Sequence, residues 1–396
     1  MATSLLMLLP LITHGAEAMP SDVGDYYGFL NQYAEKHSGA MSYLSGNWPD
    51  REAWSRQGRE KMSELLNYHP DPAPAPNAEL LETVKKAGYT RYLVRYSITA
   101  DRKTEAFLLV PDGLTKPAPA VVALHCHSGF YYYGKEKITE IDNPPQVLQD
   151  LVNKTYGGRC FADELARHGF VVLVPDAFYF GAQRLPVNSL PEMYKEDLNG
   201  LTPGSDEYIR AFNELSGKHE DKMAKSIFDA GTTWPGILVQ GDMASVDYLV
   251  TRPEVDASRI GCMGLSIGGW RAAYLFGLDP RLKAGVVAGW MTPYTSLPHH
   301  HSKSHTWMLH VPGQVNWLDL TDMTALNGPN PLMVINCLQD KLFPLDGMRA
   351  AEAKLAEIYK RMGAPDNFLC KYYDLPHSLK VPAQDDAIAW LEKSLK

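Results

Sequence analysis

Short, fully apolar runs alternate with longer segments along most of the chain. Runs of this kind are typical of parallel strands that are buried on both faces. They fall at residues 120–124, 170–174, 260–263, 284–288, 332–335 and 368–373. The segments between most of them predict helices over residues 160–168, 234–249, 269–276, 345–362 and 385–395. This alternation predicts an α/β fold with a mostly parallel central sheet and helices on both faces.

The first quarter of the chain follows a different pattern. Apolar residues such as Trp54 recur at helix-like spacing among charged ones, which predicts helices between about residues 22 and 70. Residues 70–76 alternate proline with other small or polar residues and cannot continue a helix, because proline lacks the amide hydrogen. We therefore expect an N-terminal segment and helical extension with this linker over residues 1–89, followed by the main domain over residues 90–396.

The main domain is predicted to begin with a hairpin and to carry two long inserts. Residues 92–98 and 106–110 are rich in β-branched and aromatic residues and are joined by a polar stretch. Residues 181–231 and 291–330 interrupt the alternation of strands and helices, and each follows a predicted strand. Because ligands of open α/β sheets bind at the carboxyl ends of the strands, we expect both inserts to cover that edge or to bind ligand there.

The composition favours a large folded domain and disfavours several other classes of protein. Of the 396 residues, 45% are hydrophobic and 21% are charged, close to the globular averages. The net charge of −8 argues against a nucleic-acid-binding protein. No apolar run reaches the ~20 residues that a membrane span requires. The five cysteines are widely spaced without a CxxC pair, which favours buried reduced thiols over a disulfide or zinc framework.

The N-terminus has some features of a secretory signal. Leu5 to Ile12 is a short apolar run, and Ala16 and Ala18 fit a small-x-small cleavage site. However, no lysine or arginine precedes the run, and Pro10 interrupts it. We therefore favour a retained segment and a cytoplasmic protein, with secretion as the alternative.

The sharpest motif is Gly264-Leu265-Ser266-Ile267-Gly268-Gly269, which fits G-x-S-x-G between a predicted strand and a predicted helix. Such a sharp turn forces the serine into strained backbone geometry, and small residues two positions before and after it avoid clashes. The serine hydroxyl then stands exposed at a helix N-terminus, which favours developing negative charge. The motif predicts that Ser266 is a nucleophile.

A serine nucleophile needs a general base, and in this architecture the chain order is serine, acid, histidine. Asp340 lies just past the predicted strand 332–335, where a loop acid can orient a histidine. His377 lies just past the last predicted strand. Asp374 is a competing acid, but three residues from His377 is too local to reach its ring well. We expect Asp340 to be the acid and His377 the base.

Stabilisation of an oxyanion requires two backbone N–H groups near the nucleophile. The residue after the nucleophile, Ile267, normally supplies one, and the loop after an early core strand supplies the other. In this chain that loop begins His125-Cys126-His127-Ser128-Gly129. We expect His127 to be the second donor, with Ser128 as the alternate, and His125 to be a structural residue of the loop.

Together these motifs resemble the α/β-hydrolase superfamily, on the side of dienelactone hydrolase-like proteins and acetyl xylan esterase/cephalosporin-C deacetylase enzymes. The resemblance spans about residues 90–396 and rests on the His-x-His loop, the elbow at Ser266, the Asp-Lys-x-x-Pro turn at Asp340 and the late His377. It implies an α/β-hydrolase fold, a triad of these three residues and hydrolysis of small acyl esters, often acetyl groups on sugars.

We therefore predict a serine esterase that removes small acyl groups, such as those of acetylated xylan, through an acyl-enzyme. Its partner would be a small-molecule or oligosaccharide ester, and the chemistry needs neither a cofactor nor a metal. We expect Phe130 and Trp270 to be substrate-binding residues that line a short acyl pocket. The alternatives are a serine peptidase of the prolyl-oligopeptidase type and a non-catalytic binding protein. About 90 largely helical residues cannot form the propeller that such peptidases usually carry.

One further cluster carries possible metal chemistry. His299, His300, His301 and His305 lie close together in the second insert, and the last two have the i,i+4 spacing of metal ligands. No acidic or thiol residue stands beside them in the sequence, so we favour a role in the loop or in a lid.

Overall fold

The computed structural model describes residues 20–46 and 48–396. The signal-like features of the first 18 residues lie outside the described residues. A single nine-stranded sheet forms the centre of the molecule, in the order β1-β2-β3-β5-β4-β6-β7-β8-β9. The strands are β1 (Glu79–Lys86), β2 (Tyr89–Ser97), β3 (Lys103–Pro111), β4 (Ala118–Leu124), β5 (Val171–Pro175), β6 (Val255–Leu265), β7 (Leu282–Ala288), β8 (Leu332–Cys337) and β9 (Phe368–Tyr373).

The sheet is antiparallel at one end and parallel over the rest. Strands β1, β2, β3 and β5 pair antiparallel, and the predicted hairpin is the β2–β3 pair. From β5 through β4 to β9 every pairing is parallel, as predicted. Strand β1 was not predicted, because it is the edge strand and most of its residues, including Leu80 and Leu81, are exposed. It precedes the boundary that we expected at residue 89, and it pairs with β2.

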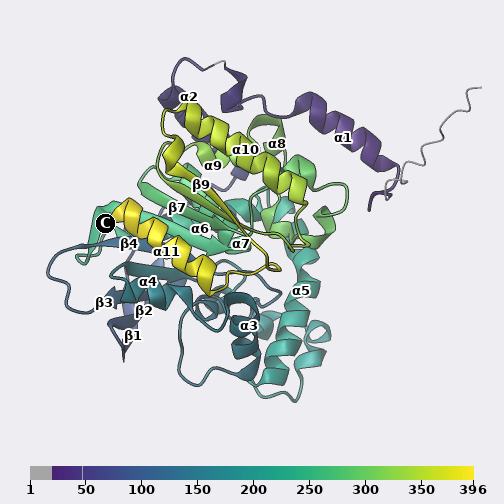
Figure 1. Cartoon of the computed structure of the whole chain (residues 1–396). Coiled ribbons are helices and arrows are strands. Elements are labelled where there is room, and N and C mark those ends of the chain that lie inside the picture. The colour runs from purple at the N-terminus through teal and green to yellow at the C-terminus, as the bar shows by residue number, and fades with distance from the viewer. Residues whose placement is uncertain (1–19, 47) are drawn as a thin grey trace, which may run out of the picture.

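Helices cover both faces of the sheet, as predicted (Figure 1). The apolar core is accordingly divided into two clusters, one on each face. One face is covered by α3 (Gln146–Tyr156), α4 (Phe161–Arg167) and α11 (Val381–Leu395), and the other by α6 (Trp234–Leu249), α7 (Ile267–Leu278) and α10 (Leu345–Arg361). The hydrophobic runs of β4 to β8 are buried throughout or nearly so, which explains why they lack the alternation of half-exposed strands.

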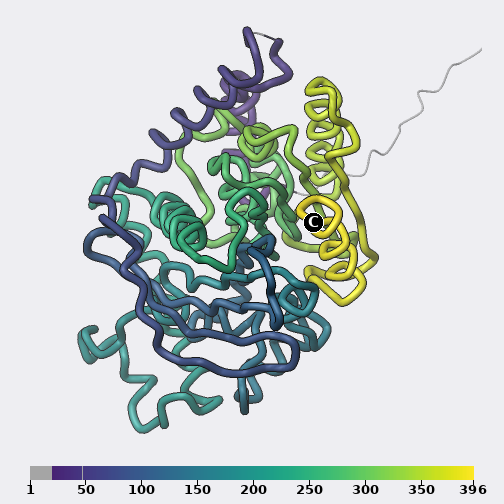
Figure 2. The backbone as a smooth tube through the Cα atoms, turned by 90° about the vertical axis from the view of Figure 1, so that its left-hand side faces the viewer, coloured from purple at the N-terminus to yellow at the C-terminus, as the bar shows by residue number. Residues whose placement is uncertain are grey.

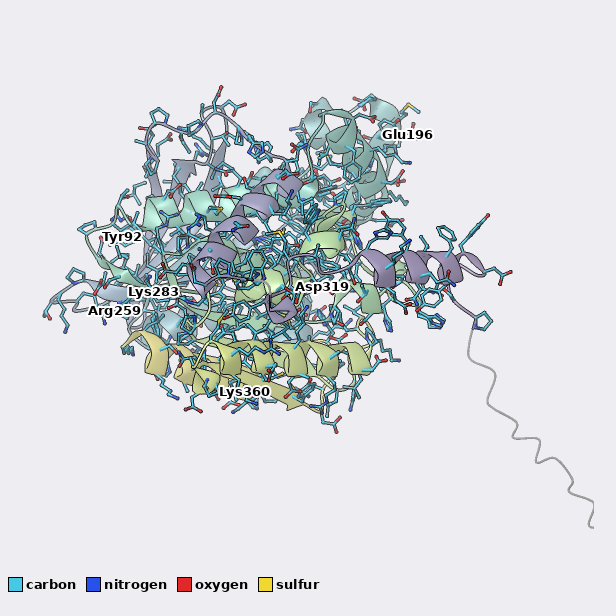
Figure 3. The ribbon with its side chains drawn as sticks, turned by 90° about the horizontal axis from the view of Figure 1, so that it is seen from above. Tyr92, Glu196, Arg259, Lys283, Asp319 and Lys360 are labelled. Carbon is cyan, nitrogen blue, oxygen red and sulfur yellow. The ribbon has the colours of Figure 1, made fainter. Side chains whose placement is uncertain are left out.

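The two predicted inserts contain structure of their own. The first, residues 181–231, holds the long helix α5 (Asp206–Asp229), and the second, residues 291–330, holds the short helices α8 (Gln314–Trp317) and α9 (Leu320–Ala325). Figure 3 places Glu196 of the first insert and Lys360 of α10 at opposite margins of the molecule, with Asp319 of the second insert between them. None of the helices in the described part of the chain is long and apolar enough to cross a membrane. All five cysteines are free thiols.

The N-terminal segment is helical, as predicted, and it packs against the main domain near the top of Figure 2. It contains α1 (Tyr26–His37) and α2 (Arg51–Leu66). Helix α2 contributes Trp54, which is completely buried and whose Nε1–H donates to the Met41 carbonyl at 2.8 Å. Arg59 donates to the carbonyls of Gly277 and Leu326, each at 3.1 Å. The extension therefore shares its core with the main domain.

The burial of Trp54 gives a test of this shared core. Replacing Trp54 with Ala should lower the free energy of unfolding by about 3–5 kcal/mol, because the substitution leaves a large cavity and removes a hydrogen bond. Phe29 on α1 is 58% exposed, so Phe29→Ala should change stability by less than about 0.5 kcal/mol. Urea unfolding of both variants measures this difference. Equal stabilities of Trp54→Ala and wild type would show that the extension does not share the core.

Candidate active site

Ser266 lies in the sharp turn between β6 and α7, where the sequence places it. Its backbone has φ 61° and ψ −123°, a conformation that a residue with a side chain adopts only under strain. The Ser266 N–H donates to the Ala288 carbonyl at the end of β7 at 2.9 Å, and the Ser266 carbonyl accepts from the Trp270 N–H in α7. These bonds hold the turn, and the side chain stays partly exposed at the start of the helix.

The glycines of the motif allow unusually close backbone contacts. A Cβ atom on Gly268 would lie 2.1 Å from the Leu124 carbonyl oxygen, and one on Gly264 would lie 2.2 Å from the Gly268 carbonyl oxygen. A Cβ on Gly269 would lie 2.2 Å from the Ala288 carbonyl oxygen. The start of α7 is therefore pressed between the ends of β4 and β7. The loop that follows β4 consequently begins beside the turn that carries Ser266.

Asp340 and His377 meet at the same edge of the sheet. They follow β8 and β9, whose last residues, Cys337 and Tyr373, are paired in register. The Nδ1 atom of His377 lies 2.6 Å from Oδ2 of Asp340, whose side chain is only 1% exposed. The other carboxylate oxygen of Asp340 accepts from the Leu342 N–H at 2.9 Å. A buried carboxylate on Nδ1 fixes the ring orientation and leaves Nε2 for another partner.

His377 also lies close to the end of β7, which contacts Ser266. A Cβ on Gly289 would lie 3.0 Å from Cε1 of His377, and Gly289 follows the residue that accepts the Ser266 N–H. Nε2 of His377 is buried and has no hydrogen-bond partner among residues 20–46 and 48–396. The competing acid, Asp374, is exposed and accepts from Gln339 at 2.9 Å instead.

The loop after β4 is held by hydrogen bonds to its side chains. His127 Nδ1 accepts from the Gly129 N–H at 2.9 Å, so Nε2 carries the hydrogen and donates to Glu220 at 2.9 Å. His125 is completely buried, and its Nε2 accepts from the Ala177 N–H at 3.2 Å. Burial, together with nearby positive charges, lowers the pKa of His125 well below its usual value, so the ring is neutral. These contacts fit the expected structural role of His125.

Glu220 on α5 connects this loop to both inserts, and no local pattern in the chain indicated such a role. Besides His127, its carboxylate accepts from the Tyr131 hydroxyl at 2.6 Å and from the Thr306 hydroxyl at 2.7 Å. Burial would raise the pKa of Glu220, but hydrogen bonds from His127, Tyr131 and Thr306 outweigh it and the pKa is lowered. Glu220 is therefore ionised and joins the first insert, the second insert and the loop after β4.

The remaining predicted site residues differ in their accessibility. Ile267 is the first residue of α7, so its N–H has no acceptor within the helix and is available at the helix N-terminus. Phe130 is only 8% exposed and stacks on Tyr133. Trp270 has no exposed surface, because its ring packs on Tyr274 and its Nε1–H donates to the Tyr294 hydroxyl at 2.6 Å. Direct contact of Trp270 with a substrate, which we expected, therefore has no support in this structure.

His299 and His300 of the second insert pack against each other, with ring centroids 3.9 Å apart, whereas His305 packs elsewhere. The His299 carbonyl accepts from the Asp22 N–H, and the His300 ring lies 3.5 Å from the Asp22 carboxylate. His305 is packed between Trp290 and Phe343, and burial lowers its pKa to about 3, which keeps the ring neutral. Within the described ranges, no three His, Cys, Asp or Glu side chains are grouped as metal ligands.

Comparison with known proteins identifies the family. The model of the dienelactone hydrolase family matches residues 147–358, more than half of the chain, and the chain belongs to this family. YtaP of Bacillus subtilis (strain 168), which is named as a hydrolase, is 23% identical over 338 residues. That match covers 85% of this chain and 98% of YtaP.

Solved structures confirm the α/β-hydrolase-type fold. A Bacteroides fragilis protein named as an acetyl xylan esterase has a TM-score of 0.66 and 16% identity, covering 89% of this chain and 84% of its own. A glucuronoyl esterase from Solibacter usitatus has a TM-score of 0.60 and 14% identity, with coverages of 91% and 98%. An acetyl xylan esterase from Paenibacillus sp. R4 has a TM-score of 0.53 and 18% identity, with coverages of 92% and 99%.

The close contact at Gly268 can be tested by adding one methyl group. Gly268→Ala should lower the free energy of unfolding by about 3 kcal/mol, since its Cβ would clash with a rigid backbone carbonyl. A matched change, Gly28→Ala in α1, meets no atom within 4 Å and should leave stability unchanged or raise it by up to about 1 kcal/mol. Thermal unfolding of both variants measures the effect. A Gly268→Ala variant as stable as Gly28→Ala would refute the tight contact.

Proposed function

We propose that this member of the dienelactone hydrolase family is a serine esterase with Ser266 as nucleophile, His377 as general base and Asp340 as the acid that orients the base. The observation that carries the proposal is the contact between His377 Nδ1 and the buried Asp340 carboxylate, with His377 Nε2 left without a partner in the described chain. The strained backbone of Ser266, beside the β7 end that His377 also contacts, supports it independently.

The reaction would proceed in two steps. His377 Nε2 takes the proton of the Ser266 hydroxyl, and the hydroxyl oxygen attacks the ester carbonyl carbon. The N–H groups of Ile267 and His127, with Ser128 as the alternate for His127, donate to the oxyanion. His377 then gives its proton to the leaving alcohol, and water cleaves the acyl-enzyme with His377 again as base. Asp340 holds the required tautomer and stabilises the imidazolium that forms in each step.

The proposed substrates are esters of small acyl groups, above all acetyl esters of carbohydrates. The relatives named as acetyl xylan esterases favour this substrate class. Bulky rings beside the proposed base also favour a small acyl group. Phe343 is nearly buried with its centroid 6.2 Å from that of His377, and Trp290 packs against Phe343 at 4.8 Å. Trp307 of the second insert is 45% exposed, which leaves an aromatic face for a sugar ring.

A second candidate substrate is the ester of a sugar acid. Glucuronoyl esterases align over nine-tenths of this chain and nearly the whole of the Solibacter usitatus enzyme. In such a substrate the sugar would be on the acyl side of the ester, and the same three residues would carry out the reaction. Methyl glucuronate and acetylated xylan oligomers therefore belong in one assay panel.

The roles of the two aspartates give the sharpest kinetic test. Ser266→Ala should lower kcat by about 10⁴–10⁶-fold, and Asp340→Asn by about 10⁴-fold, because the second change removes the acceptor that fixes the His377 tautomer. Asp374→Asn is the matched control and should retain wild-type kcat, since its side chain does not bond His377. The measurement is hydrolysis of p-nitrophenyl acetate. If Asp374→Asn lost activity and Asp340→Asn kept it, the acid assignment would be wrong.

The size of the acyl group gives a separate test of the substrate class. We expect kcat/KM to be highest for acetyl and to fall in steps through butyryl to octanoyl esters of one alcohol. A closed pocket discriminates by about 1–3 kcal/mol for each extra methylene. An octanoyl ester cleaved as well as the acetyl ester would contradict the small-acyl proposal. It would leave the triad proposal intact.

A further inference from the structure

Lys137 is a completely buried lysine directly behind the loop that follows β4. It ends a short 3-10 helix, Lys135–Lys137. Its Nζ donates to the Cys126 carbonyl, to the Phe130 carbonyl at 3.0 Å and to the His127 carbonyl at 3.4 Å. The ammonium also lies 4.5 Å from the centroid of the Phe180 ring. All three ammonium hydrogens are thus directed at carbonyl oxygens of a single loop.

The neighbouring buried lysine has a different set of partners. Lys135 forms ion pairs with Asp176 at 2.8 Å and with Glu136 at 2.9 Å. Lys137 forms no ion pair with any residue of the described ranges, and a buried charge without a counter-ion is costly. Methionine would fill a similar space without that cost. The charge at Lys137 therefore calls for a reason other than the stability of the fold.

Two other groups share these carbonyls with Lys137: the Phe130 N–H donates to the His127 carbonyl at 3.0 Å, and His125 Nδ1 lies 3.1 Å from the Cys126 carbonyl. Together with Lys137 they determine where the loop directs its N–H groups. In a trans peptide unit, the C=O of one residue and the N–H of the next point in opposite directions. Because the carbonyls of residues 126, 127 and 130 point to Lys137, the N–H groups of His127, Ser128 and Tyr131 point away from it. The Tyr131 N–H donates to Asn213 Oδ1 at 2.8 Å. The other two N–H groups belong to the residues expected on sequence grounds to bind the oxyanion.

The loop is held in a conformation that it would not favour alone. Ser128 has φ 55° and Gly129 has φ 62°, so two successive residues are left-handed and one of them carries a side chain. Successive N–H groups in turns of this kind can form a concave site for an anion. Lys137 binds the carbonyl side of the same peptide units, which also polarises their N–H groups and makes them stronger donors.

We propose that Lys137 is a positioning residue for ester hydrolysis: its ammonium binds the carbonyls of residues 126 and 127, and thereby aims and polarises the N–H groups that stabilise the oxyanion. This inference rests on the proposed esterase function and adds to it a residue that does not touch the substrate. Its contribution would be made in the transition state, where negative charge develops, rather than in substrate binding.

If Lys137 acts through its charge, kcat should depend on the protonation of Lys137 and therefore on pH. Burial lowers the pKa of Lys137 to about 8, and Arg271 on α7 also lowers it. Cys126, Asp176 and Glu136 act in the opposite direction, and the neighbouring His125 is neutral. Because the charged form holds the carbonyls, kcat should fall as the pH rises through about 8.

This alkaline loss of activity would not be a loss of stability. The pKa of Lys137 in the folded state lies below its unfolded value near 10.4, so between these values the unfolded chain binds more protons than the folded one. The contribution of Lys137 to the free energy of unfolding therefore rises with pH over the range in which kcat falls. A melting temperature measured at each pH separates the two effects.

The test compares Lys137→Met and Lys137→Arg with Lys135→Met, using the full chain and p-nitrophenyl acetate. Lys137→Met should lower kcat by about 10²–10³-fold and change KM by less than about threefold. It should also abolish the alkaline fall, that is, the decrease of kcat as the pH rises through about 8. Lys137→Arg keeps the charge at all accessible pH values, so it should recover part of kcat and show no fall near pH 8. Lys135→Met removes a buried charge that does not bind the loop. It should lower the melting temperature but keep kcat and the alkaline fall.

The outcomes separate this inference from the proposed function. If the wild type hydrolyses esters and Lys137→Met keeps kcat, or keeps the alkaline fall, the role of Lys137 is wrong and the triad stands. If Lys137→Met does not fold, the test rests on Lys137→Arg. Lys137→Arg with wild-type kcat and an unchanged decrease of kcat near pH 8 would also refute the role of Lys137. If the wild type cleaves no ester in the panel, the proposed function itself fails.

Discussion

The close contact between backbone segments at the start of α7 is the constraint on which the rest of the site depends. Gly264 and Gly268 let the turn after β6 lie against the Leu124 carbonyl, and no other residue type fits at these two positions without moving a backbone atom. This contact gives Ser266 its strained conformation and sets the first turn of α7 beside the end of β4. The loop after β4 therefore begins beside the first turn of α7.

Two largely buried carboxylates hold the histidine rings of the loops near this turn. Asp340 holds the His377 ring through Nδ1, and Glu220 holds the His127 ring while it also binds Tyr131 and Thr306. In each case a largely buried carboxylate accepts directional hydrogen bonds, which water would otherwise weaken. For the proposed esterase, this arrangement would give a site that is organised before substrate arrives, so that its donors need not reorganise when charge develops.

The sequence allowed a correct prediction of the features that depend on local patterns. Buried strands such as β4 and β7 appear as apolar runs, and the turn at Ser266 needs its glycines at fixed spacing, so both could be located. Features that are set by tertiary contacts could not be located from the sequence. Glu220 lies in a helix of an insert with no local signal, and its partners are about 90 residues away on either side. We expected Trp270 to contact the substrate because it is near Ser266 in the chain. However, Trp270 lies one turn further along α7, and its side chain is buried in the core.

The proposed mechanism requires Ser266 to form a covalent acyl-enzyme, and trapping that intermediate is the decisive experiment. The enzyme would be mixed with p-nitrophenyl acetate, quenched in acid within the first turnover and digested, and its peptides would be analysed by mass spectrometry. We expect one acetyl group per chain, carried by Ser266, and none in Ser266→Ala. An acetyl group that was carried by another residue at equal stoichiometry, or rapid hydrolysis by Ser266→Ala, would contradict it.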